Sequence, residues 1–212
     1  MSQSNTTFNL RIGVVAGNAV AVLSIAYAIV LAIGIVSLPS PDFPIQNPWF
    51  TVLEILILGI APAMVAFAVG LHAWAPGERK PYALLSVVFM SMCALITCCV
   101  HFAVLALSHQ PAFATGSWPT LVFAFRWPSV VYALDILAWD VFFPLSTFFA
   151  ALTIQRVGLM GLARNLLFGS AALAFVGLAG VPLASMNVRN IGIFGYVLLA
   201  TVFRREATRG AA

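Results

Sequence analysis

Three acidic side chains lie inside long apolar stretches of this 212-residue chain. They are Glu54, Asp135 and Asp140, half of the six acidic residues that the chain carries. A charged side chain at the centre of a bilayer costs about 2.5–3.5 kcal/mol on insertion scales, so such groups usually face a cavity or a partner. Burial also favours the uncharged carboxylic acid, which can then donate a proton. We therefore take the three acids as candidate catalytic residues.

His101 is a fourth candidate because its expected depth in the membrane matches those of two of the acids. At a rise of about 1.5 Å per residue, Glu54 and Asp135 lie about 7 and 10 Å inside the outer ends of their helices, and His101 lies about 10 Å below the same surface. Asp140 lies about 18 Å deep, near the mid-plane. The three titratable groups at one level predict a pocket that opens to the outer side.

Four aromatic residues lie close to Asp135 and Asp140 in the sequence: Tyr132, Trp139, Phe142 and Phe143. Tyr132 lies three positions before Asp135 and Trp139 lies four positions after it, so the three side chains share one helix face. The face of an aromatic ring attracts a cation. These four residues are therefore the candidate ligand-binding set.

Asp140 and Pro144 predict an irregularity in the same helix. A proline inside a helix cannot bond to the carbonyl four residues earlier, and here that carbonyl belongs to Asp140. Asp140 also lies about 140° around a regular α-helix from Asp135, so we expect the two acids to meet different neighbours. In the alternative interpretation, the acids only hydrogen-bond to adjacent helices, with Asp140 capping the backbone near Pro144.

The composition places these residues in a membrane. The chain is 62% hydrophobic and 8% charged, whereas an ordinary soluble domain is about 25% charged. Because one crossing needs about 20 apolar residues, the pattern predicts an all-α polytopic bundle of six transmembrane helices in a single membrane domain, residues 1–212. The six helices are expected near residues 12–37, 50–73, 82–107, 129–153, 166–186 and 191–203. The last is short, so it must be tilted little, be extended by its flanks, or be anchored by snorkelling of Arg189 and Arg204.

The basic residues indicate the orientation, because Arg and Lys in short loops are retained on the cytoplasmic side. With the N-terminus inside, eight basic residues lie in cytoplasmic segments and two lie outside. The inner set is Arg11, Arg79, Lys80, Arg156, Arg164, Arg204, Arg205 and Arg209, and the outer set is Arg126 and Arg189. This split predicts that both termini are cytoplasmic. We expect a multi-pass protein of a bacterial inner membrane or a plasma membrane.

Two further features concern the connections and the helix contacts. The outer segment 112–127 is apolar enough to lie on the membrane, either as a plain interfacial connector or as a lid. Gly13 and Gly17 have the small-xxx-small spacing that lets helices approach closely, and Gly177 and Gly180 are expected to act likewise.

No cofactor or metal is indicated by the sequence. The three cysteines fall inside one apolar run and offer no zinc spacing. His72 and His101 are expected near opposite surfaces and so cannot hold one haem. Lys80, the single lysine, is expected in a loop, which excludes a retinal Schiff base. The scattered basic residues form no nucleic-acid-binding face, and the oligomeric state is not indicated.

Two classes of function remain open, and the sequence does not decide whether the protein is an enzyme. The first is a cofactor-independent acid–base enzyme, of isomerase or cyclase type, acting on a hydrophobic lipid or isoprenoid. A neutral acid would donate a proton, and a second carboxylate or His101 would accept one. The alternative is a non-enzymatic carrier, receptor or assembly subunit that binds a small cationic or amphipathic ligand.

Overall fold

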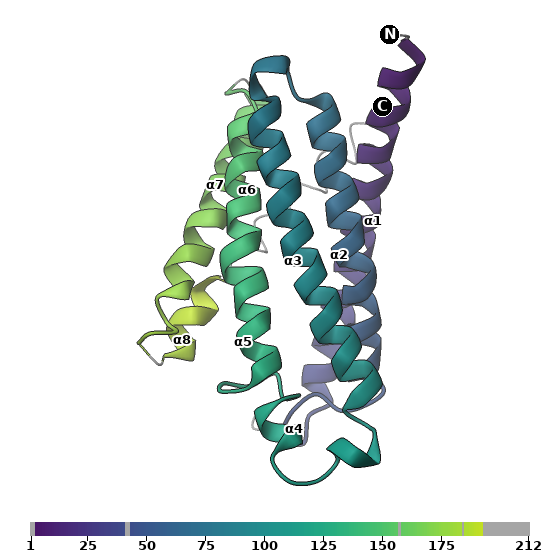
Figure 1. Cartoon of the computed structure of the whole chain (residues 1–212), viewed down its shortest axis with the longest axis vertical. Coiled ribbons are helices and arrows are strands. Elements are labelled where there is room, and N and C mark those ends of the chain that lie inside the picture. Colours follow the sequence, from purple (N-terminus) through teal and green to yellow (C-terminus); the bar gives the residue numbers. More distant parts are fainter. Residues whose placement is uncertain (1–2, 41–42, 157, 184, 193–212) are drawn as a thin grey trace.

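The structure, a computed structural model, describes residues 3–40, 43–156, 158–183 and 185–192. These residues are mostly helical and form no strand. Five of their helical segments are long and apolar enough to cross a membrane (Figure 1). The segments are α1 (Gln3–Val36), α2 (Trp49–Trp74), α3 (Lys80–Leu107), the composite of α5 (Val130–Ile136), a π-helical turn η3 (Leu137–Phe142) and α6 (Phe143–Thr153), and α7 (Gly158–Leu178). The chain is therefore a helical membrane protein.

Each long helix packs mainly on its neighbour in the chain, in the order α1, α2, α3, α6, α7 (Figure 1). The α2–α3 connection contains the short helix η1 (Gly77–Arg79), and the long connection after α3 contains η2 (Pro111–Phe113) and α4 (Trp118–Leu121). Beyond α7, the chain turns back into α8 (Met186–Arg189) and η4 (Asn190–Gly192), which pack against α7. One apolar core extends from Val20 of α1 to Leu167 of α7.

The interface of α1 and α2 is built on two glycines. Gly13 lies against the backbone of Gly70, and Gly17 lies against the ring of Phe67. Without a hydrophobic driving force between helices in lipid, such close backbone approach is a main source of helix association. The small-xxx-small pair at Gly13 and Gly17 thus faces α2, while much of the rest of α1 is exposed apolar surface.

Replacing Gly70 by alanine is expected to weaken this interface. A Cβ at Gly70 would lie 2.3 Å from the Cα of Gly13, and neither backbone can yield without moving a helix. Overpacking of this kind costs about 1–3 kcal/mol, measured as the free energy of unfolding in mixed micelles. Gly59→Ala in the same helix is the matched control, because its Cβ would make an ordinary 3.5 Å contact with Leu23. Equal stability of the two variants would contradict the prediction.

The structure places helices over the first four expected ranges and corrects the fifth. The fifth span was expected at residues 166–186, with Pro182 inside it, but α7 covers Gly158–Leu178 and Pro182 lies in the turn that follows. The physical reason is that proline is disfavoured in a helix interior, so the helix ends before it. The sixth span, 191–203, lies outside the described residues except for 191 and 192, which belong to η4.

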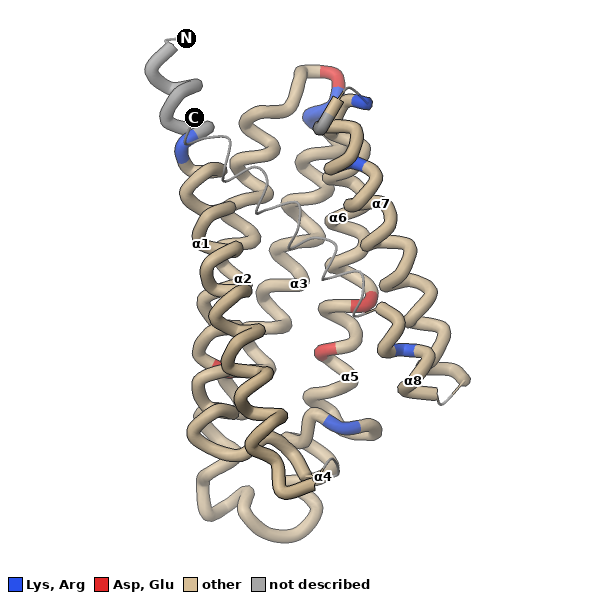
Figure 2. The backbone as a smooth tube through the Cα atoms, turned by 180° about the vertical axis from the view of Figure 1, so that it is seen from behind, with Lys and Arg blue, Asp and Glu red and all other residues tan. Residues whose placement is uncertain are grey.

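Several basic residues gather at one end of the structure (Figure 2). Arg79 and Lys80 lie at the α2–α3 connection, and Arg156 and Arg164 lie where α6 gives way to α7. Figure 2 shows these basic positions together at one end, where Glu78 of η1 also lies, whereas the three acids of the candidate site lie further along the helices, with Arg189 among them. The expected cytoplasmic location of both termini remains a prediction.

Candidate functional site

His101 lies between two carboxylates that come from two other helices. Its Nδ1 is 2.9 Å from Oε2 of Glu54 on α2, and its Nε2 is 3.8 Å from Oδ1 of Asp135 on α5. All three side chains are largely buried. Glu54, His101 and Asp135, which were expected to share one depth, are thus in contact. They form a row across the bundle in which the imidazole ring lies between the two carboxylates.

Arg189 of α8 extends this row to the third acid. Its Nε donates to Oδ2 of Asp140 at 2.7 Å, its Nη2 is 3.9 Å from Oδ2 of Asp135, and its Nη1 donates to the hydroxyl of Tyr132 at 3.3 Å. The guanidinium also lies 5.2 Å from the centre of the Tyr132 ring. The alternative in which Arg189 anchors a sixth span by snorkelling is therefore wrong, because its side chain is buried among acids inside the structure.

Two glycines at the end of α7 bring Arg189 into place. A Cβ at Gly177 would lie 2.7 Å from the carbonyl oxygen of Arg189, and a Cβ at Gly180 would lie 2.4 Å from its amide nitrogen. Glycine at both positions lets the segment after α7 fold back directly onto the helix. These glycines were expected to bring two helices together, and the structure shows that they allow the segment that contains Arg189 to pack closely against the end of α7.

The π-helical turn explains why Asp135 and Asp140 share a partner. The sequence predicts different neighbours for them, because five residues of a regular α-helix turn through about 140°. In a π-helix the bonded residues are five apart, so a turn over Leu137–Phe142 brings the two acids nearer to one side. Pro144 follows in the first turn of α6, consistent with the predicted irregularity. Both acids meet Arg189 instead of separate partners.

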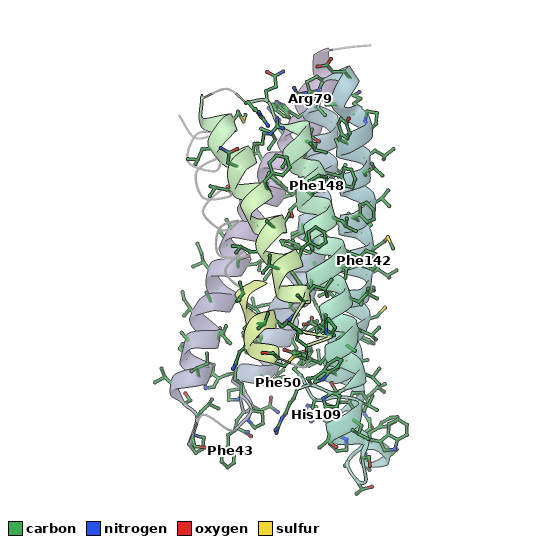
Figure 3. The ribbon with its side chains drawn as sticks, turned by 90° about the vertical axis from the view of Figure 1, so that its left-hand side faces the viewer. Phe43, Phe50, Arg79, His109, Phe142 and Phe148 are labelled. Atoms are coloured by element: carbon green, nitrogen blue, oxygen red, sulfur yellow. The ribbon has the colours of Figure 1, made fainter. Side chains whose placement is uncertain are left out.

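The long connection between α3 and α5 covers one side of the cluster. Phe125 from this connection stacks on the His101 ring, with 5.0 Å between the ring centres and 23° between the ring planes. The same ring contacts Phe50 of α2 at 6.4 Å. The segment 112–127 therefore does more than join α3 to α5: one of its side chains shields His101. Figure 3 shows Phe50 at this end of the bundle and His109 beside it, near the end of α3.

The four expected aromatic residues lie in different places. Tyr132 belongs to the cluster through Arg189. Trp139 packs against Phe143 with 5.3 Å between the ring centres, and Phe142 stacks with Phe89 of α3. A residue not selected from the sequence, Tyr27 of α1, lies within electrostatic range of both Glu54 and Asp135. The aromatic surroundings of the acids thus include Tyr27, Tyr132 and Phe125.

The carboxylates of the cluster differ in how far they are exposed. The side chain of Asp135 is 16% exposed, whereas those of Glu54 and Asp140 are 4% and 2% exposed. Asp135 is therefore the carboxylate of the cluster most open to a guest molecule. Over the described part of the chain, no group of three or more His, Cys, Asp or Glu side chains is arranged to hold a metal ion.

Fold and site together define a helical membrane protein with a buried ionisable cluster that spans four helical segments. Comparison with protein-family models, with characterised proteins and with solved structures finds no match to this chain. What the cluster does must therefore be argued from its own chemistry.

Proposed function

We propose that the protein is a cofactor-independent acid–base enzyme that moves a proton on a hydrophobic lipid or isoprenoid substrate in the outer half of the membrane. The observation that carries the proposal is the position of His101 between Glu54 and Asp135. An imidazole flanked by two carboxylates can take a proton on one nitrogen while the other nitrogen remains held.

The contacts suggest a separate role for each of Asp135, His101 and Glu54. Asp135, the most exposed of them, is the group that gives a proton to the substrate or takes one from it. His101 exchanges that proton with Asp135, and Glu54 orients the imidazole through Nδ1. In an isomerisation, one carbon gains a proton and another loses one, so the reaction balances without an oxidant or other co-reactant.

Arg189 and Asp140 complete the site as a fixed ion pair. Their 2.7 Å contact holds the guanidinium beside Asp135 and Tyr132. We therefore assign Arg189 a positioning role, in which it holds the side chains of Asp135 and Tyr132 in place beside His101.

A second candidate function is the binding of a small cationic or amphipathic ligand without turnover. The observation that favours it is the charge balance of the cluster: three carboxylates face one guanidinium and one imidazole. With every acid ionised, these five residues carry a net negative charge even when His101 is protonated. A buried negative charge attracts a cation, and the ring of Tyr132 offers it a further contact.

Asp135→Asn separates the two functions. Native mass spectrometry of the purified chain reports bound small molecules, and mass spectrometry of lipid extracts from producing cells reports conversion. Loss of conversion in a folded variant supports the enzyme, whereas loss of a bound cation with unchanged lipids supports the ligand-binding alternative. Glu78→Gln is the matched control, because Glu78 is exposed at the opposite end. If Asp135→Asn alters neither measurement, both proposals are wrong.

A further inference from the structure

Three arginines gather at the end of the structure opposite the candidate site. Arg79 lies at the end of η1, Arg156 lies in the α6–α7 connection and Arg164 lies in the second turn of α7. Arg156 and Arg79 are near enough for their charges to act on that of Arg164. Figure 3 shows Arg79 at this end of the bundle, and Figure 2 shows the basic positions of the two connections together.

Two of these guanidinium groups have buried nitrogen atoms without a hydrogen-bond partner among the described residues. They are Nη1 of Arg79 and Nε of Arg164. Arg164 is held in place by other contacts, since its Nη1 donates to the carbonyl oxygen of Ile154 at 3.1 Å and its guanidinium lies 5.3 Å from the centre of the Phe168 ring. A buried donor gains by pairing with an acceptor, so these two nitrogen atoms are available to a ligand that binds at this end of the structure.

The neighbouring acid does not supply that acceptor. Glu78 approaches Arg79 only through Nε, at 3.9 Å, and its own side chain is 77% exposed. A contact at that distance between exposed groups contributes little. An anion with several acceptor oxygens suits these donors, because it can accept from two guanidinium groups.

We propose that this arginine cluster, formed by Arg79, Arg156 and Arg164, binds the phosphate of an anionic phospholipid. Phosphate suits arginine because its oxygens accept the parallel donors of the guanidinium group. Basic pockets between membrane helices on the cytoplasmic side are a recurrent form of anionic-lipid site. The lipid source is favoured over free phosphate because Met160 and Leu162, beside Arg164, expose apolar side chains that acyl chains can cover. This site is independent of the function proposed for the outer cluster.

The test measures lipid binding by the purified full chain in detergent. Phosphatidylglycerol, phosphatidylcholine and inorganic phosphate are added separately, and binding is followed by native mass spectrometry and by the shift in unfolding temperature. We expect phosphatidylglycerol to bind in preference to phosphatidylcholine. Arg79→Gln is expected to weaken that binding about fivefold, the effect of one basic residue near an anionic lipid surface.

Two controls keep the outcome interpretable. Arg126→Gln removes an exposed arginine from the long connection between α3 and α5 and is expected to leave phosphatidylglycerol binding unchanged. Arg164→Lys keeps the charge but loses the planar group, so it should bind more tightly than Arg164→Gln. Equal binding of the two phospholipids, unchanged binding by Arg79→Gln, or an equal effect of inorganic phosphate alone would each overturn the proposal.

Discussion

Arg189→Gln is expected to destabilise the protein by about 3–5 kcal/mol, because it leaves buried acids without their cation. Asp140 is 1% exposed and accepts from Nε of Arg189 at 2.7 Å, and Asp135 lies 3.9 Å from the same guanidinium. Removing one member of a buried ion pair is more damaging than removing both, since the remaining charge has lost its compensation. The measurement is the free energy of unfolding in mixed micelles, followed by circular dichroism.

The matched control is Arg126→Gln, which removes an exposed arginine from the long connection between α3 and α5. Surface changes of this kind usually stay within about 0.5 kcal/mol. A double-mutant cycle adds Asp140→Asn: if the two side chains interact as the structure shows, the double variant costs less than the two single variants together. A cost for Arg189→Gln no greater than that for Arg126→Gln would contradict the ion pair.

The first four spans and part of the cluster could be predicted from the sequence because both depend on simple geometry. Long apolar runs give the spans, and a fixed rise per residue gives the depth of each group within its span. That arithmetic placed Glu54, His101 and Asp135 at one level, and the structure shows them in contact. The glycine at position 13 was likewise expected in a close helix contact, and it lies against Gly70.

Arg189 could not be placed in the same way because its position depends on how the chain folds after α7. The sequence predicts a span to residue 186, which would leave Arg189 at a membrane surface. The observed turn, with α7 ending at Leu178 and the chain folding back past Gly180, carries the side chain to Asp140 instead. A signal was nevertheless present. An acid near the mid-plane, such as Asp140, usually has a partner, and Arg126 and Arg189 are the two basic residues that the predicted topology places on the outer side.

The aromatic residues show a second limit of sequence reasoning. Spacing along one helix predicts which side chains share a face, but it does not reveal the helix or loop that lies opposite. Phe142 thus packs on Phe89 of α3, whereas Phe125 and Tyr27, from distant parts of the chain, lie near the titratable groups. These two residues carry no local pattern that would single them out.

His101→Gln is expected to lower turnover by a factor of about 10²–10⁴, the range that a positioned general acid or base contributes. Glutamine retains a polar group for Glu54 but cannot take up and release a proton, so the connection between Glu54 and Asp135 is lost. Turnover is measured on the lipid fraction that differs between cells producing the unchanged protein and cells producing Asp135→Asn. The pH dependence of the residual activity should change in shape, because the titrating imidazole has been removed.

His109→Gln is the control for this variant, because His109 is exposed beyond the end of α3 and no described contact joins it to the cluster. It should keep full turnover and an unchanged pH profile. Because the His101 ring also stacks on Phe125, the variant could lose stability as well as turnover. The free energy of unfolding of His101→Gln is therefore measured too, and an intact fold with lost turnover identifies a proton-transfer role. Full turnover in His101→Gln would rule out the acid–base mechanism. The negative charge of Asp135 and Glu54 would then favour cation binding, which needs no titrating group between them.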